Sequence, residues 1–209
     1  MKKPTSMLLE ANFDINQIGE TLEWSFTRKD GDGNPVKGRY AGAIYFTVGE
    51  QMKVRVRAGG YDAFESFKVL DCSLITRPQI IAIAPGGLAT YAVPSPFAGV
   101  VGASVEIPAD EFVPGRSADT EEEGRRYYTK VQKWENFLTV AESTGRWEIS
   151  FALTVEITRS SGKVERRVFV FDPEGQVGAG ITPPMMDDTD DSVACQLMPE
   201  SDIAGRLPT

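Results

Sequence analysis

The stretch that decides the fold class is residues 147–158, Trp-Glu-Ile-Ser-Phe-Ala-Leu-Thr-Val-Glu-Ile-Thr. Every odd-numbered position carries a large apolar side chain, and every even-numbered position carries a polar or small one. Because side chains of an extended chain point alternately to opposite sides, this pattern predicts a strand with one face on a core and the other in solvent. Residues 159–162 are typical of a turn, and residues 163–171 are again rich in strand-forming side chains. We therefore predict an antiparallel hairpin with Gly162 in its turn.

Residues 52–58 repeat the alternation. Their even-numbered positions are apolar, and the opposite side carries Lys53, Arg55 and Arg57. Further strand-forming runs are residues 7–15, 21–27, 40–48, 67–76, 79–84, 89–93 and 100–107. About ten short strands separated by Gly, Pro, Asp and Asn, without interleaved amphipathic helices, are typical of an all-β fold. We predict an antiparallel β-sandwich of the jelly-roll or immunoglobulin-like type.

One segment also fits a helix. Residues 120–123 have the form of a capping box, and Tyr127, Val131 and Trp134 follow at helical spacing. Residues 134–140, in contrast, are rich in strand formers. We therefore allow at most one short helix, near residues 120–133, and expect a strand after Lys133.

The chain has 209 residues, of which 41% are hydrophobic, so it is long enough to bury a core without disulfides or metals. We expect residues 1–181 to form a single β-sandwich domain. Residues 182–209 contain six acidic residues and one arginine. Such a composition cannot bury enough apolar surface to offset the entropy of ordering, so we expect an acidic, disordered tail.

Composition excludes several kinds of chemistry. The chain has no histidine, which excludes Ser-His-Asp and Cys-His catalysis and histidine-ligated metal sites. Its two cysteines, Cys72 and Cys195, are too few for a structural zinc site or an iron–sulfur cluster. We expect both to be free thiols in a reducing compartment, with one disulfide as the alternative. We expect no catalytic residue and no cofactor.

Charge and hydropathy argue against two kinds of partner, nucleic acids and membranes. The formal net charge of −8 opposes binding to phosphate backbones, so we expect no nucleic-acid partner. No apolar run is long enough for a signal peptide or a membrane span. These patterns indicate a cytoplasmic protein without a membrane association.

Two loops are candidate binding sites. Asp30, Asp32 and Asn34 place oxygen ligands at alternate positions, as in the first half of a calcium loop. The following residues depart from the EF-hand pattern, so the alternative is an ordinary polar loop. The second candidate is Tyr61 with Asp62, because an aromatic ring beside a carboxylate can stack on a sugar and bind its hydroxyls. The alternative there is that Tyr61 anchors the core.

Charged clusters have two interpretations each. Asp110, Glu111 and residues 121–123 could supply paired carboxylates for acid–base catalysis, or they could be solvated loop acids. The basic side of residues 52–58 could bind an anion or an acidic partner, or it could serve solubility alone.

Two blocks of the chain resemble a known family. The first contains, in order, Trp134-x-Asn136, Leu138-Thr139, Gly145, the alternating strand 147–158, a glycine-containing turn and Phe171-Asp172-Pro173. The second is residues 48–57, in which a Val-Gly-acid turn precedes a basic, alternating strand. Both blocks resemble the AidA/PixA family of bacterial inclusion-body proteins. The resemblance transfers no functional residue, because neither block carries a catalytic motif.

This resemblance implies a compact β-sandwich made in the bacterial cytoplasm, sometimes deposited in inclusions and without established catalysis. Some relatives are associated with sugar binding. Our first hypothesis is a non-enzymatic protein that acts by self-association or accumulation, with a homo-oligomer as its assembled form. The alternative is a carbohydrate-binding, lectin-like module, with calcium as an aid to binding. The second alternative is a His-free, carboxylate-dependent hydrolase.

Overall fold

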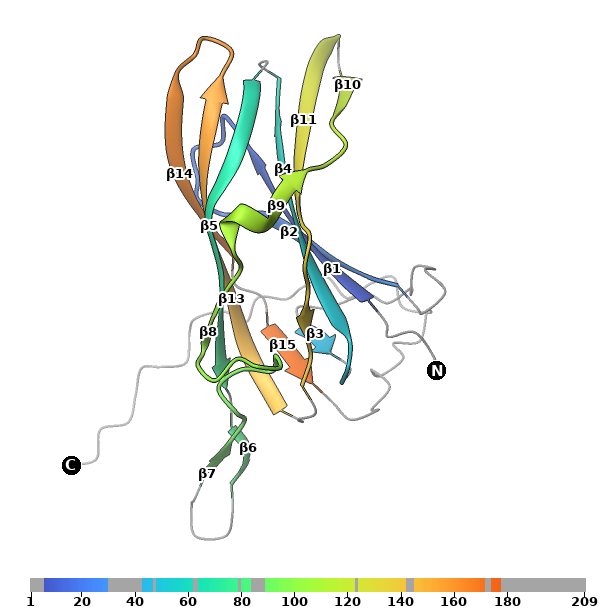
Figure 1. Ribbon diagram of the computed structural model, residues 1–209, viewed down its shortest axis with the longest axis vertical. Coiled ribbons are helices and arrows are strands. Elements are labelled where there is room, and N and C mark those ends of the chain that lie inside the picture. Colours follow the sequence, from blue (N-terminus) through green and yellow to red (C-terminus); the bar gives the residue numbers. More distant parts are fainter. Residues whose placement is uncertain are drawn as a thin grey trace, which may run out of the picture.

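The structure is a computed structural model that describes residues 6–29, 43–46, 48–61, 64–78, 80–83, 89–122, 124–141, 145–171 and 174–177. Most of these residues lie in strands, and the one helix among them is the single 3-10 turn η1 (Ala109–Glu111). Two sheets face each other, as Figure 1 shows. The predicted all-β sandwich is confirmed.

The first sheet, sheet A, has the strand order β10-β11-β4-β1-β2, with β9 paired to β11 and β12 paired to β4. Its strands are β1 (Ser6–Asp14), β2 (Glu23–Lys29), β4 (Gln51–Gly60), β9 (Phe112–Pro114), β10 (Ala118–Glu122), β11 (Arg125–Trp134) and β12 (Leu138–Thr139).

The second sheet, sheet B, has the order β3-β15-β13-β5-β8, with β14 paired to β13. Its strands are β3 (Ala43–Phe46), β5 (Phe64–Pro78), β8 (Ser104–Glu106), β13 (Gly145–Arg159), β14 (Val164–Phe171) and β15 (Glu174–Val177). The remaining strands, β6 (Ile80–Ile83) and β7 (Ala89–Tyr91), form a separate two-stranded hairpin.

Both alternating stretches behave as predicted. The odd-numbered side chains of β13 from Trp147 to Ile157 are all buried, and so are the even-numbered side chains of β4 from Met52 to Ala58. β13 and β14 form the predicted antiparallel hairpin. Gly162 closes its turn at a φ of 80°, a left-handed conformation that glycine adopts without steric cost.

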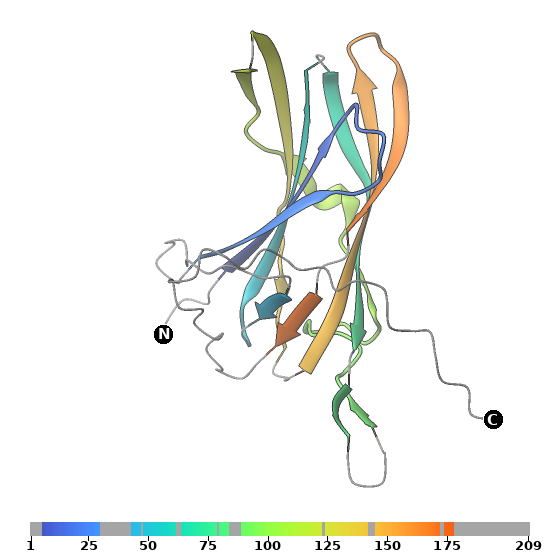
Figure 2. The same cartoon turned by 180° about the vertical axis from the view of Figure 1, so that it is seen from behind.

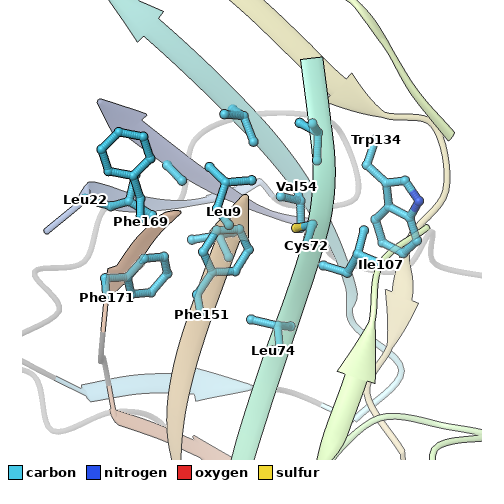
Figure 3. Close-up of a cluster of buried hydrophobic side chains, with 14 of the residues drawn as sticks. Leu9, Leu22, Val54, Cys72, Leu74, Ile107, Trp134, Phe151, Phe169 and Phe171 are labelled. Atoms are coloured by element: carbon cyan, nitrogen blue, oxygen red, sulfur yellow. The ribbon is translucent and has the colours of Figure 1, made fainter. Parts of the chain in front are cut away.

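The core fills the space between the sheets. Sheet A contributes Leu9 and Val54, and sheet B contributes Phe151 and Phe169, all buried (Figure 3). Phe13 reaches across from β1 to stack on Phe169, with ring centroids 4.6 Å apart. Full burial of an apolar side chain of this size contributes about 1.5–3 kcal/mol, so this interlocking of the two inner faces holds the layers together.

Two strand pairs depart from the predicted antiparallel arrangement. β1 and β4 run parallel, and so do β3 and β15. Parallel neighbours need a crossover connection, and the chain passes through β2 and β3 between β1 and β4. Gly49 does turn the chain before β4, at a φ of 80°. The strands on either side of it nevertheless belong to different sheets.

The helix allowed near residues 120–133 does not form. β10 and β11 pair there as a hairpin, with Thr120 opposite Tyr127 and Gly124 in the turn at a φ of 73°. Helical spacing misleads here because residues four apart, such as Tyr127 and Val131, lie on the same side of a strand as well as of a helix. Pairing of β11 with β4 gives this backbone its hydrogen-bond partners across the sheet.

A buried ion pair joins two parts of sheet A. The side chain of Glu50, which precedes β4 and is 1% exposed, accepts hydrogen bonds from Arg28 of β2. Arg28 Nε lies 2.6 Å from Oε1, and Arg28 Nη2 lies 2.9 Å from Oε2. The sequence marks Glu50 as a turn residue and gives no sign of this contact. Since a buried charge is costly without its partner, each side chain requires the other.

We predict that Glu50→Gln lowers the free energy of unfolding by about 3–5 kcal/mol, because it removes the carboxylate that accepts both hydrogen bonds from the mostly buried Arg28 guanidinium. Urea denaturation of the full chain measures this loss. The matched control is Glu156→Gln, since the partner of Glu156, Arg166, is 72% exposed. An exposed pair of this kind contributes about 0–1 kcal/mol. Equal losses in the two variants would contradict the prediction.

Candidate functional site

The outer face of sheet A gathers polar side chains from three adjacent strands. On β1 the buried positions are odd-numbered, so Asn12 and Asp14 point away from the core. Antiparallel pairing places Glu23 of β2 beside Asn12, and parallel pairing places Arg57 of β4 on its other side. Laterally paired residues project from the same face of a sheet. The register alone thus brings two carboxylates, an amide and a guanidinium together.

These four residues line a groove of about 630 Å³. Thr129 of β11 lies opposite Gly59 of β4, and Thr120 of β10 lies opposite Tyr127 of β11, so the next two strands complete the groove. Small-molecule sites in proteins have volumes of roughly 300–1,000 Å³, and this groove falls within that range. Most of the residues that line it carry polar side chains, and one wall is an aromatic ring.

Tyr127 forms the aromatic wall. Its ring covers Gly59, where a Cβ atom would overlap the phenol, so the absence of a side chain at Gly59 allows the ring to lie on the sheet. The Tyr127 hydroxyl donates a hydrogen bond to Asp14 Oδ2 at 3.3 Å. Tyr61 packs edge-on against Tyr127 with ring centroids 5.0 Å apart, and the Arg125 guanidinium lies 4.5 Å from the Tyr61 centroid. Tyr61, itself in contact with Arg125, therefore supports the Tyr127 ring.

The basic side of β4 is balanced by one acid of β1. Glu10 accepts a hydrogen bond from Arg55 Nη1 at 2.9 Å, and its second carboxylate oxygen lies 3.4 Å from Arg57 Nη2. The predicted orientation of Lys53, Arg55 and Arg57 away from the core is confirmed. Since Glu10 offsets part of the arginine charge, Asp14 and Glu23 give the groove a slight excess of negative charge.

A buried acceptor lies in the floor of the groove. Asn12 Oδ1 is inaccessible to solvent and has no hydrogen-bond partner among the described residues. Leaving a buried acceptor unpaired costs about 1–3 kcal/mol. Natural proteins satisfy nearly all buried polar groups, so an exception in the floor of a polar groove marks this part of the sheet as unusual.

Tyr61, the aromatic residue of the second candidate site, is 36% exposed and supports the groove wall from outside the groove. The nearby Phe64 is buried in the core. Asp62 lies outside the described residues, and so do Asp30, Asp32 and Asn34 of the predicted calcium loop. Within the described ranges, no three His, Cys, Asp or Glu side chains come close enough to hold a metal ion.

Sequence reasoning missed Asn12, Asp14 and Glu23. The alternation in residues 7–15 could have shown that positions 12 and 14 face outward. Which strand lies beside them could not be read, because the β1–β4 pair is parallel and its members are far apart in the chain.

Glu111, predicted as a solvated loop acid or a catalytic carboxylate, has a structural contact. Its Oε2 accepts hydrogen bonds from Trp134 Nε1 and Asn136 Nδ2, each at 2.8 Å. The Glu135 N–H also donates to the Glu111 carbonyl at 3.2 Å. The Trp134-x-Asn136 motif thus clamps η1 to the end of β11.

Cys72 is a free thiol buried in the core, and Cys195 lies outside the described residues. Burial, reinforced by the nearby Asp71 carboxylate, raises the pKa of the Cys72 thiol. The thiolate is the reactive form of cysteine. Because the raised pKa keeps the Cys72 thiol protonated, this side chain packs in the core as an apolar group.

No family model matches the chain, and no curated protein or solved structure matches it either. In the part of the chain that the structure describes, no helix combines the length and the apolar character needed to cross a bilayer.

We predict that Glu111 stabilises the fold in a pH-dependent way. The hydrogen bonds from Asn136 and Trp134 lower the pKa of Glu111, so the folded state favours its ionised form. This stabilisation is complete above the ordinary glutamate pKa of about 4.3 and is lost as the pH falls through the lower folded-state pKa. The difference in thermal midpoint between the wild type and Glu111→Gln should therefore shrink as the pH falls from about 6 to about 3.

Thermal unfolding followed by circular dichroism at stepped pH measures this difference. Asp110→Asn is the matched control, because it removes the adjacent carboxylate and leaves the Trp134 and Asn136 hydrogen bonds in place. It should keep the wild-type pH dependence. A Glu111→Gln difference that stays constant with pH would contradict the prediction.

Proposed function

We propose that this protein is a non-catalytic, carbohydrate-binding β-sandwich that holds a short glycan in the groove on the outer face of sheet A. The observation that carries the proposal is the placement of the Tyr127 ring beside Asn12, Asp14 and Glu23 in one groove. A sugar ring has an apolar C–H face and a rim of hydroxyls. Tyr127 supplies the surface on which the apolar face can pack, and the amide and carboxylates supply hydrogen-bond partners for the rim.

The charges in the groove indicate which glycans fit. Asp14 and Glu23 are acceptors when ionised, so they suit hydroxyl and ammonium donors. Arg57 also lines the groove, and its Nη2 lies 3.4 Å from Glu10 Oε1, so the Glu10 carboxylate offsets part of its positive charge. We therefore expect neutral and amino sugars to bind better than uronic, sialylated or sulfated ones, because like charges across an interface oppose binding.

The resemblance to the AidA/PixA family agrees with this proposal in two respects. It implies a β-sandwich, and some members of that family are associated with sugar binding. Self-association, the first hypothesis from the sequence, is compatible with a groove that faces solvent. The cytoplasmic location stays a prediction.

The direct experiment is an array of neutral, amino and acidic oligosaccharides probed with the full chain, followed by calorimetric titration of the best ligand. The array is read with calcium and with a chelator, because Asp30, Asp32 and Asn34 stay a predicted cation loop. Each bound oligosaccharide is also incubated with the protein and checked for cleavage. Absence of binding would overturn the proposal, and release of products would overturn its non-catalytic part in favour of the carboxylate-dependent hydrolase.

We predict that Tyr127→Ala weakens glycan binding about tenfold or more, because it removes the central aromatic contact. Tyr127→Phe should retain most of the affinity, since the ring stays. Gly59→Ala should also weaken binding, because its new methyl group displaces the Tyr127 ring from the sheet. The readout is the dissociation constant from calorimetry, with thermal unfolding as a check on folding.

The matched control for these variants is Phe137→Ala. Phe137 is 43% exposed and lies between β11 and β12, and β12 pairs with the start of β4, at the end opposite to Gly59. Its loss should leave the affinity unchanged. Equal losses in Phe137→Ala and Tyr127→Ala would place the binding site elsewhere.

A further inference from the structure

The hairpin of β6 and β7, here called the arm, stands apart from the sandwich. Figures 1 and 2 show it projecting beyond one end of the two sheets in both views. β6 and β7 pair with each other as a separate two-stranded sheet. Among the described residues, no backbone hydrogen bond links the outer edge of either strand to sheet A or sheet B.

The arm lies in the longest uncharged part of the chain. Residues 78–105 contain no Asp, Glu, Lys or Arg, although a quarter of all residues are charged. Tyr91 at the end of β7 is 59% exposed, and Val93 just after it is 50% exposed. Open strand edges in natural proteins usually carry charges, especially lysine, that prevent pairing with other chains. The arm lacks this protection.

We propose that the arm is a dimerisation element, in which β7 of one copy pairs antiparallel with β7 of a second copy. A two-fold axis between them would produce a four-stranded sheet in the order β6-β7-β7-β6. The pairing uses β7 because the register of β6 is interrupted between Ile80 and Ala82. Such an irregularity bends a strand and disturbs its edge for further pairing.

Three physical arguments favour a second copy over a lipid bilayer. In hydrocarbon, the unpaired N–H and C=O groups of two open edges would each cost several kcal/mol, so an open hairpin does not insert. A two-stranded hairpin alone is marginally stable in water, and a second hairpin doubles the sheet. Finally, two chains with a net charge of −8 repel each other, and the uncharged arm is where they can approach with least repulsion.

The expected dimer is weak. β7 has three residues, Ala89–Tyr91, so the shared ladder is short. Interfaces well below the standard size are typical of transient complexes, and we expect a dissociation constant on the order of 10 µM. This inference does not depend on the glycan groove, which lies on other strands.

The test is sedimentation velocity of the full chain between about 1 and 200 µM, a range that brackets the expected dissociation constant. The wild type should shift from monomer to dimer across this range. Thr90→Lys, which places a charge on β7, should weaken the dimer at least tenfold, roughly the effect of one like-charge contact at an interface. The control, Val168→Lys, places the same charge at an exposed position of β14, which pairs with β13 alone among the named strands, and should leave the dimer intact.

A second measurement does not rely on variants. Amide hydrogen exchange of the wild type should slow in residues 89–91 as the concentration rises, and exchange in residues 164–168 of β14 should stay constant. A monomer at every concentration would overturn the proposal, as would a dimer that Val168→Lys disrupts and Thr90→Lys does not. Flotation of the monomer with neutral phosphatidylcholine vesicles would overturn it in favour of a lipid partner.

Discussion

The fold depends on the strict in-and-out alternation of β13. This strand is hydrogen-bonded along both edges, to β5 on one side and to β14 and β15 on the other, so it occupies the interior of sheet B. Its buried face runs from Trp147 to Ile157 without interruption. A shift of one residue in its pairing would turn all of these side chains to solvent. The strand can therefore hold one register, and that register positions the layer on which sheet A packs.

The two faces of sheet A differ: the inner face packs on sheet B, and the outer face is exposed to solvent. Its inner face completes the core through residues such as Leu9 and Val54, which leaves the alternate positions free of packing demands. The outer positions of β1, β2 and β4 bring Asp14, Glu23 and Arg57 into one groove. The groove on sheet A and the uncharged arm beside sheet B are separate surfaces, so a glycan and a second copy of the chain could be bound at the same time.

Several residues that draw attention in the sequence have structural contacts. Trp134 and Asn136 hold Glu111, and Glu50 holds Arg28 inside the molecule. Trp134, Asn136 and Glu50 belong to the two blocks that resemble the AidA/PixA family, and in this chain they form contacts at the ends of strands. The groove residues of β1 and β2 lie outside both blocks.

The sequence by itself determined many of the strands, the β13–β14 hairpin and the buried face of β4, because alternation is a local property with a period of two residues. It could not determine which strands lie side by side. Parallel pairing of β1 with β4, the β10–β11 hairpin in place of a helix, and the position of Asn12 between Glu23 and Arg57 all depend on contacts between distant segments. The tertiary structure decided these features, because the backbone N–H and C=O groups of a strand find their hydrogen-bond partners on whichever strand lies beside it. The sequence of one strand does not specify which strand that is.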